Sequence, residues 1–125
     1  MTKTNTPSNI SRVSNLLQII SPEPRLEIML AIGAGEACVC HLEAKLGYRQ
    51  AYISQQLMAL REAGLLRTRR DGKYIYYRLE KPDILDVVEM ASRLAGMDLP
   101  ISSKTSLSLS SCECPNCSTQ GVANV

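Results

Sequence analysis

Apolar residues recur at helical spacing through the first part of the chain. Residues 9–20 carry a single apolar stripe, which predicts an amphipathic helix. Ser21 and Pro22 interrupt that stripe, and we expect a second helix with Ser21 as its N-cap and Pro22 in its first turn. The apolar positions of this second helix stop near Gly33. Two consecutive helices are therefore predicted.

A helix-turn-helix pattern follows. Apolar spacing predicts a short helix over about 39–46, which ends at Gly47, and a longer helix from about Gln50 to Ala63. Two helices separated by a tight glycine-containing turn are typical of the helix-turn-helix, in which the second helix enters the major groove of DNA.

After Gly64 the period changes from helical to alternating. Residues 65–70 lead into Asp71-Gly72, a strong hairpin signal, and residues 73–79 alternate in character. We expect a two-stranded hairpin whose apolar side packs on the helices. The core side is predicted to carry Ile75, Tyr77 and Leu79, and the other side Tyr74, Tyr76 and Arg78.

The last apolar pattern predicts a helix over about 82–96 that begins at Pro82. Its apolar surface is wider than one packing face needs, so this helix and the first one either form a dimer interface or pack within one core. Beyond it, residues 97–125 are Ser-rich and read as a flexible tail that contains cysteines, and residues 1–8 read as a flexible N-terminus.

These elements together predict a mainly α domain with a β-hairpin wing, a winged helix-turn-helix over residues 9–96. Nine basic residues against three acidic ones lie between Lys45 and Lys81, while the rest of the chain is net acidic. This charge pattern fits either a face for a polyanion or an ordinary solvated surface. The predicted DNA contacts are Arg49, Gln50, Ala51, Tyr52, Ser54 and Gln55 on the fourth helix, and Arg67, Arg69, Arg70 and Lys73 on the hairpin.

Several function classes fit the sequence poorly. No apolar run approaches the roughly 20 residues that span a bilayer, and no signal-peptide pattern follows the polar start, so we expect a cytoplasmic protein without membrane partners. With one histidine, no nucleophile–base pairing and no phosphate-binding loop, an enzyme is not expected.

Five cysteines, an odd number, suggest thiol chemistry rather than a disulfide framework. They form two clusters: Cys38 and Cys40, and the closely spaced Cys112, Cys114 and Cys117. Thiolates favour soft ions such as As(III), Cd(II), Pb(II) or Zn(II). Residues two apart on a helix point about 200° from one another. Cys38 and Cys40 can therefore share an ion only if their segment is extended or if binding distorts the first turn.

From about Pro24 to Leu79 the chain resembles the ArsR/SmtB family of metal-responsive winged-helix repressors. The resemblance is carried by Pro24–Met29, Cys38-Val-Cys-His-Leu42, Ile53-Ser-Gln-Gln-Leu57, Leu60–Leu66 and Arg69-Arg-Asp-Gly-Lys73. It implies a homodimer that binds a palindromic operator in double-stranded DNA and leaves it when an ion binds.

The resemblance also implies that Cys38 and Cys40 are ligands, because arsenic and cadmium/lead sensors of the family carry Cys-Val-Cys at this place. Many arsenic sensors have a further cysteine where this chain has Glu43, and residues 1–37 contain none. The missing thiols would come from Cys112, Cys114 and Cys117, within or across subunits. The zinc site of other members is not expected, since the last helix has acids but no histidine.

The leading hypothesis is a transcriptional repressor that a soft ion releases from DNA. Two alternatives remain open. In one, the same cysteines act as a thiol-redox or reactive-sulfur switch on a winged-helix repressor. In the other, a cysteine site binds zinc for a purely structural purpose and a partner protein regulates DNA binding.

Overall fold

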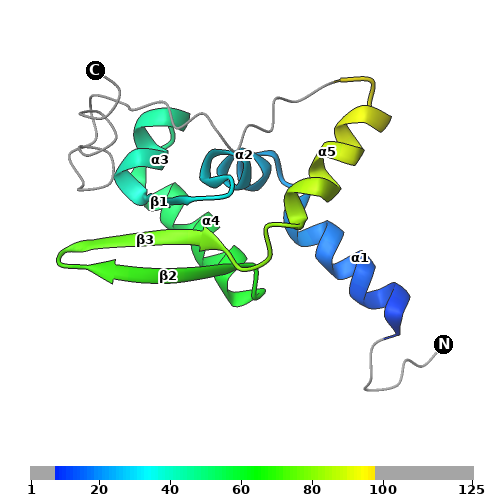
Figure 1. Cartoon of the computed structure of the whole chain (residues 1–125), viewed down its shortest axis with the longest axis horizontal. Helices are drawn as coiled ribbons and strands as arrows, with labels where there is room; N and C mark the ends of the chain where they lie inside the picture. Colours follow the sequence, from blue (N-terminus) through cyan, green and yellow to red (C-terminus); the bar gives the residue numbers. More distant parts are fainter. Residues whose placement is uncertain (1–7, 98–125) are drawn as a thin grey trace.

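The computed structural model describes residues 8–97, which contain five helices and three strands. Their order along the chain is α1 (Asn9–Ile20), α2 (Glu23–Ile32), β1 (Glu36–Cys38), α3 (Val39–Leu46), α4 (Gln50–Glu62), β2 (Leu66–Asp71), β3 (Tyr74–Leu79) and α5 (Ile84–Leu94). Helices α3 and α4 form the helix-turn-helix, and β2 and β3 form the wing beside it (Figure 1). The predicted winged helix-turn-helix fold is confirmed.

One hydrophobic core joins the helices to one face of the sheet. Its completely buried side chains come from the inner faces of α2, α3 and α4: Ile28, Met29, Leu42, Ile53, Leu57 and Leu60. The sheet adds Ala37, Leu66 and Leu79 to this core. Because α4 places a buried residue at every third or fourth position, its opposite face is left to solvent.

Helix boundaries agree with the sequence prediction for α1, α3 and α4 to within one residue. Gly47 ends α3 in the left-handed conformation, with φ of 80°. The predicted N-cap of the second helix was wrong. The Ser21 hydroxyl instead donates to the carbonyl of Gln18 at 3.2 Å and closes α1, so that Pro22 occupies the cap and α2 begins at Glu23. The last helix also begins later than predicted, at Ile84.

The sheet has three strands in the order β1-β3-β2, all antiparallel, whereas the sequence predicted only the hairpin. The additional strand, β1, has three residues and pairs with β3 so that Cys38 lies opposite Tyr76. A strand this short has too few positions to show an alternating pattern. Its pairing with β3 gives it its extended form.

The wing differs from the prediction in its turn and in its faces. Asp71 pairs with Tyr74, which makes Gly72 and Lys73 the two-residue loop. Gly72 has a φ of 64° at the first loop position, a conformation that favours glycine. The predicted core side is largely right: Leu79 is buried and Tyr77 packs against the core, but Ile75 is 38% exposed. Tyr76, predicted on the outer side, is 1% exposed, and it packs against Cys38 and Cys40.

Helices α1 and α5 lie at the end of the molecule away from the tip of the wing (Figure 1). Both present large apolar side chains to solvent. On α1 these are Ile10, Val13 and Leu17, and on α5 they are Val87, Met90 and Leu94. Ile10 is 78% exposed and Leu94 is 83% exposed, so much of this apolar surface is not used in the core of one chain.

Candidate nucleic-acid interface and thiol site

The outer face of α4 carries the predicted base-reading side chains. All five of them are exposed: Gln50, Ala51, Tyr52, Ser54 and Gln55. Arg49, also exposed, is the N-cap residue of α4. Amide and hydroxyl side chains on an exposed helix can hydrogen-bond to base edges in a major groove, where each base pair presents a distinct pattern.

Two contacts fix α4 and the turn before it to α2. Arg25 on α2 donates through Nε to Oε1 of Gln56 and through Nη1 to the carbonyl of Ile19, both at 2.9 Å. Tyr48, in the turn, donates to Glu27 at 2.5 Å. That hydrogen bond, with smaller contributions from desolvation and nearby charge, raises the pKa of Tyr48 to about 12. These contacts therefore fix the orientation of the polar face of α4 relative to the rest of the domain.

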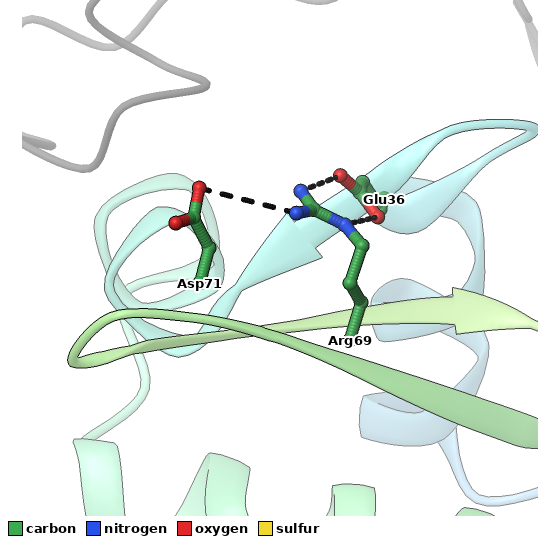
Figure 2. Close-up of polar contacts among 3 residues, drawn as sticks. All are labelled: Glu36, Arg69 and Asp71. Atoms are coloured by element: carbon green, nitrogen blue, oxygen red, sulfur yellow. Dashed lines mark hydrogen bonds and ion pairs between the residues drawn. The ribbon is translucent and has the colours of Figure 1, made fainter.

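The four predicted wing residues are all exposed, but their charges are differently compensated. Arg67 forms an ion pair with Glu80 at 2.9 Å. Arg69 donates through Nε to Glu36 on β1 at 3.2 Å and makes a second bond to the same carboxylate through Nη2 (Figure 2). Among residues 8–97, Arg70 and Lys73 make no ion pair. Those two cations at the wing tip are the ones whose charge remains available to a polyanion.

Cys38 and Cys40 come together at the junction between β1 and α3. Cys38 is the N-cap of α3 with extended φ and ψ of −89° and 166°, while Cys40 lies in the first turn. Their Sγ atoms are 2.7 Å apart, as thiols rather than a disulfide. Of the two arrangements that would allow convergence, the extended segment is the one observed. Cys38 is 2% exposed and Cys40 is partly exposed, so an ion would approach from the Cys40 side.

The residue after the thiol pair, His41, is nearly buried. Its backbone N–H donates to Sγ of Cys38 at 3.4 Å, which caps the helix. Burial, and then the charge of Lys45, lower the pKa of the His41 imidazole. Within residues 8–97 no group of three His, Cys, Asp or Glu side chains could hold an ion. The predicted ligands Cys112, Cys114 and Cys117 lie outside the described residues.

Sequence reasoning missed Glu36 and Tyr76. Both belong to the neighbourhood of the thiols: Tyr76 packs against Cys38, and Glu36 lies two residues before it on β1. Neither residue type stands out in the sequence. Their roles follow from the pairing of β1 with β3, which the sequence did not predict.

Comparison with known proteins agrees with this architecture. Residues 22–68 match the family described as "Bacterial regulatory protein, arsR family". The chain is 42% identical over 79 residues to the biofilm growth-associated repressor of Agrobacterium fabrum, covering 63% of this chain and 68% of that protein. It is 46% identical over 65 residues to the arsenical resistance operon repressor of Escherichia coli K12, covering 51% of this chain and 56% of that protein.

Solved structures are similar over the same region. HlyU from Vibrio cholerae matches with a TM-score of 0.65 and 28% identity, covering 74% of this chain and 100% of that one. The AntR antimony-specific transcriptional repressor matches with a TM-score of 0.61 and 27% identity, covering 77% of this chain and 89% of that one. None of the described helices is long and apolar enough to cross a membrane. The chain belongs to the ArsR family of bacterial transcriptional regulators.

Proposed function

We propose that this protein is a DNA-binding transcriptional repressor that a soft, thiophilic metal or metalloid ion releases from its operator. The observation that carries the proposal is the convergence of two thiols, 2.7 Å apart, on the first turn of the helix-turn-helix. An ion bound there acts on the element that presents α4 to DNA. Its effect on DNA affinity equals the difference in its binding energy between the two states.

The DNA-binding half of the proposal rests on two surfaces. The exposed polar face of α4 would read bases, with Gln50, Ser54 and Gln55 as donors and acceptors and with Arg49, Ala51 and Tyr52 at the entry to the groove. The wing would supply phosphate contacts, mainly through Arg70 and Lys73, since Arg67 and Arg69 are paired with acids.

The active form is a homodimer on a palindromic operator in double-stranded DNA. The exposed apolar residues of α1 and α5, among them Ile10, Val13, Met90 and Leu94, support a two-fold interface at the end away from the wing. Two recognition helices related by that axis would read half-sites about one helical turn apart. We expect the protein to act in the cytoplasm, where its operator lies.

The ligand set combines both cysteine clusters. Cys38 and Cys40 supply two thiolates, and As(III) takes three sulfurs while Cd(II), Pb(II) or Zn(II) accommodate four. We assign the remaining ligands to Cys112, Cys114 and Cys117, from the same subunit or from its partner. Two relatives named as arsenical and antimony repressors support an inducer of this chemical kind.

The test is a titration of operator binding against As(III), Cd(II), Pb(II) and Zn(II) in the presence of a reductant. We expect at least one ion to lower DNA affinity, and we expect no response in Cys38→Ser/Cys40→Ser. A variant with all three tail cysteines changed to Ser should retain apo DNA binding and show a weaker response. Tight ion binding that leaves DNA affinity unchanged would instead indicate a structural zinc site and would refute the proposal.

The contact between the thiols also favours a second function, a redox switch. Hydrogen peroxide would convert the two thiols of Cys38 and Cys40 to a disulfide, with loss of two protons and two electrons and formation of two waters. Loss of DNA binding on addition of peroxide to metal-free protein, and its recovery with dithiothreitol, would support this function over ion sensing.

A further inference from the structure

A single row of side chains crosses the sheet from the thiol pair to the wing. In the strand register Cys38 lies opposite Tyr76, and Tyr76 lies opposite Arg69. Residues directly opposite one another in antiparallel strands point to the same face of the sheet. The row therefore places a proposed ion ligand two strands away from an arginine of the wing, on the face opposite the main core.

The members of this row are in contact. Cys38 and Tyr76 form a small buried cluster, with exposures of 2% and 1%. The guanidinium carbon of Arg69 lies 4.5 Å from the centre of the Tyr76 ring, which is within cation–π range. The same guanidinium is held by both carboxylate oxygens of Glu36, which is on β1 two residues before Cys38 (Figure 2).

Contacts within the protein therefore compensate the charge of Arg69. The bond to Glu36 raises the pKa of the guanidinium, and Asp71 lies 3.9 Å away on the other side. Because two carboxylates compensate its charge and two of its five N–H groups donate to Glu36, Arg69 attracts a phosphate less than an unpaired arginine does. Arg69 thus joins the wing to β1, unlike its neighbour Arg70, which forms no ion pair within residues 8–97.

Ion binding would disturb one end of this row. The Sγ atoms of Cys38 and Cys40 are in contact with one another, so an ion that binds both thiolates must insert between them. Cys38 packs against Tyr76, and Glu36 lies on the same strand as Cys38. A displacement of Cys38 would therefore affect both side chains that contact Arg69.

We propose that Arg69 is a positioning residue, which couples the Cys38/Cys40 site to the wing through Tyr76 and Glu36. The inference rests on the proposed function for its biological meaning. Occupation of the thiols weakens the attachment of the wing to β1, and the basic tip no longer lies where it meets phosphate. Arg69 then governs how strongly the ion affects DNA binding, and contributes little to phosphate contact itself.

The first test compares Glu36→Gln with Glu80→Gln. Both remove the acid of an Arg–Glu pair on the wing, but only Glu36 is connected to the thiols. In the wild type, the ratio of the operator Kd measured with Cd(II) to the Kd measured without it is about 5- to 150-fold for coupling of ordinary size. In Glu36→Gln and in Arg69→Gln we expect it to fall below about 2-fold. Glu80→Gln should keep the wild-type ratio.

Cd(II) affinity, followed by sulfur-to-metal absorption, distinguishes lost coupling from a damaged site. It should stay within about twofold of wild type in all three variants, since a coupling residue alters the response more than the ligation. A Glu36→Gln protein that binds Cd(II) normally and keeps the wild-type Kd ratio would overturn the inference.

The second test needs neither ion nor operator. Phenylarsine oxide bridges two thiols, and it is added to the protein with Cys112, Cys114 and Cys117 changed to Ser. We expect faster hydrogen exchange at the amides of β2 and β3, with no such change in the Glu36→Gln version. Unchanged hydrogen exchange in β2 and β3 would refute the inference, even if ions release the protein from DNA. If hydrogen exchange in the wing becomes faster but no ion changes the DNA affinity, the proposed function is refuted and the coupling between the thiols and the wing still stands.

Discussion

Helix α4 and the β2–β3 wing both face outward with polar side chains, but they are held in place by different forces. The core contacts of α4 are completely buried side chains such as Ile53, Leu57 and Leu60. The wing enters the core only at its base, through Leu66 and Leu79, and is otherwise attached by hydrogen bonds to β1 and by charged contacts such as Arg69–Glu36. Its strand β2 has only one buried residue, Leu66.

This difference in attachment indicates that α4 and the wing have different roles. Close-packed apolar contacts permit little movement, which suits a helix that must present side chains to base edges at fixed positions. Exposed ion pairs contribute little to stability and rearrange easily. A wing held in this way fits its proposed role in salt-dependent phosphate contact and its proposed coupling to the thiols of Cys38 and Cys40.

The largest expected effect comes from removing the anchor of α4. Leu57→Ala deletes a side chain with 0% exposure and should lower the free energy of unfolding by about 2–5 kcal/mol. Met58→Ala, next to it but 61% exposed, should change it by less than about 0.5 kcal/mol. Urea denaturation measures both. Similar losses in the two variants would show that α4 is not anchored through this face.

The next effect concerns recognition. Gln55 is exposed on α4 and is proposed to contact a base, so Gln55→Ala should cost about 1–3 kcal/mol of operator binding and relax the preference at one base pair of each half-site. Competition binding with single-base operator variants checks this. A uniform loss of affinity across all variants, without relaxed preference, would show that Gln55 does not read a base.

A smaller effect distinguishes two arginines of the wing. Arg70→Gln should weaken binding to all sequences and reduce the slope of log affinity against log salt by about 1. Arg67→Gln should leave that slope nearly unchanged, since its charge is paired with Glu80. The measurement is operator affinity of the metal-free protein across a salt series. Equal slope changes would remove the distinction between the two side chains.

The smallest effect concerns the hydrogen bond from Tyr48 to Glu27, which holds the turn before α4. The pKa of Tyr48 is raised from 10.0 to about 12, so the bond contributes fully below pH 10 and its contribution is lost as the pH rises toward 12. The difference in melting temperature between wild type and Tyr48→Phe should be constant from neutral pH to about 10 and then shrink. A difference that is independent of pH up to 12 would contradict this origin.

The elements that the sequence predicted well are those with local signals. The stripe that repeats Ile53, Leu57 and Leu60, together with Gly47 before α4, specifies that helix without reference to the rest of the chain. The wing was predicted for the same reason, because Gly72 marks its turn, although the loop lies one residue later than expected. The exposed face of α4 follows directly from its apolar stripe.

The thiol site was only half predictable. The Cys-Val-Cys pattern identifies Cys38 and Cys40 as candidate ligands, but helical geometry alone pointed their side chains apart. The structure brings them together because pairing with β3 keeps Cys38 extended, and α3 begins only after it. Tyr76 was assigned to the solvent side for a related reason, since the strand pattern does not reveal that it packs against Cys38 and Cys40.

The sequence by itself determined the helices, the hairpin and the chemistry of the candidate site, because periodicity, glycine positions and thiols act through local preferences. Tertiary structure alone decided that Cys38, Tyr76 and Arg69 form one row and that Glu36 holds Arg69. These residues are far apart along the chain, and β1 is too short to be stable unless β3 supplies its hydrogen bonds.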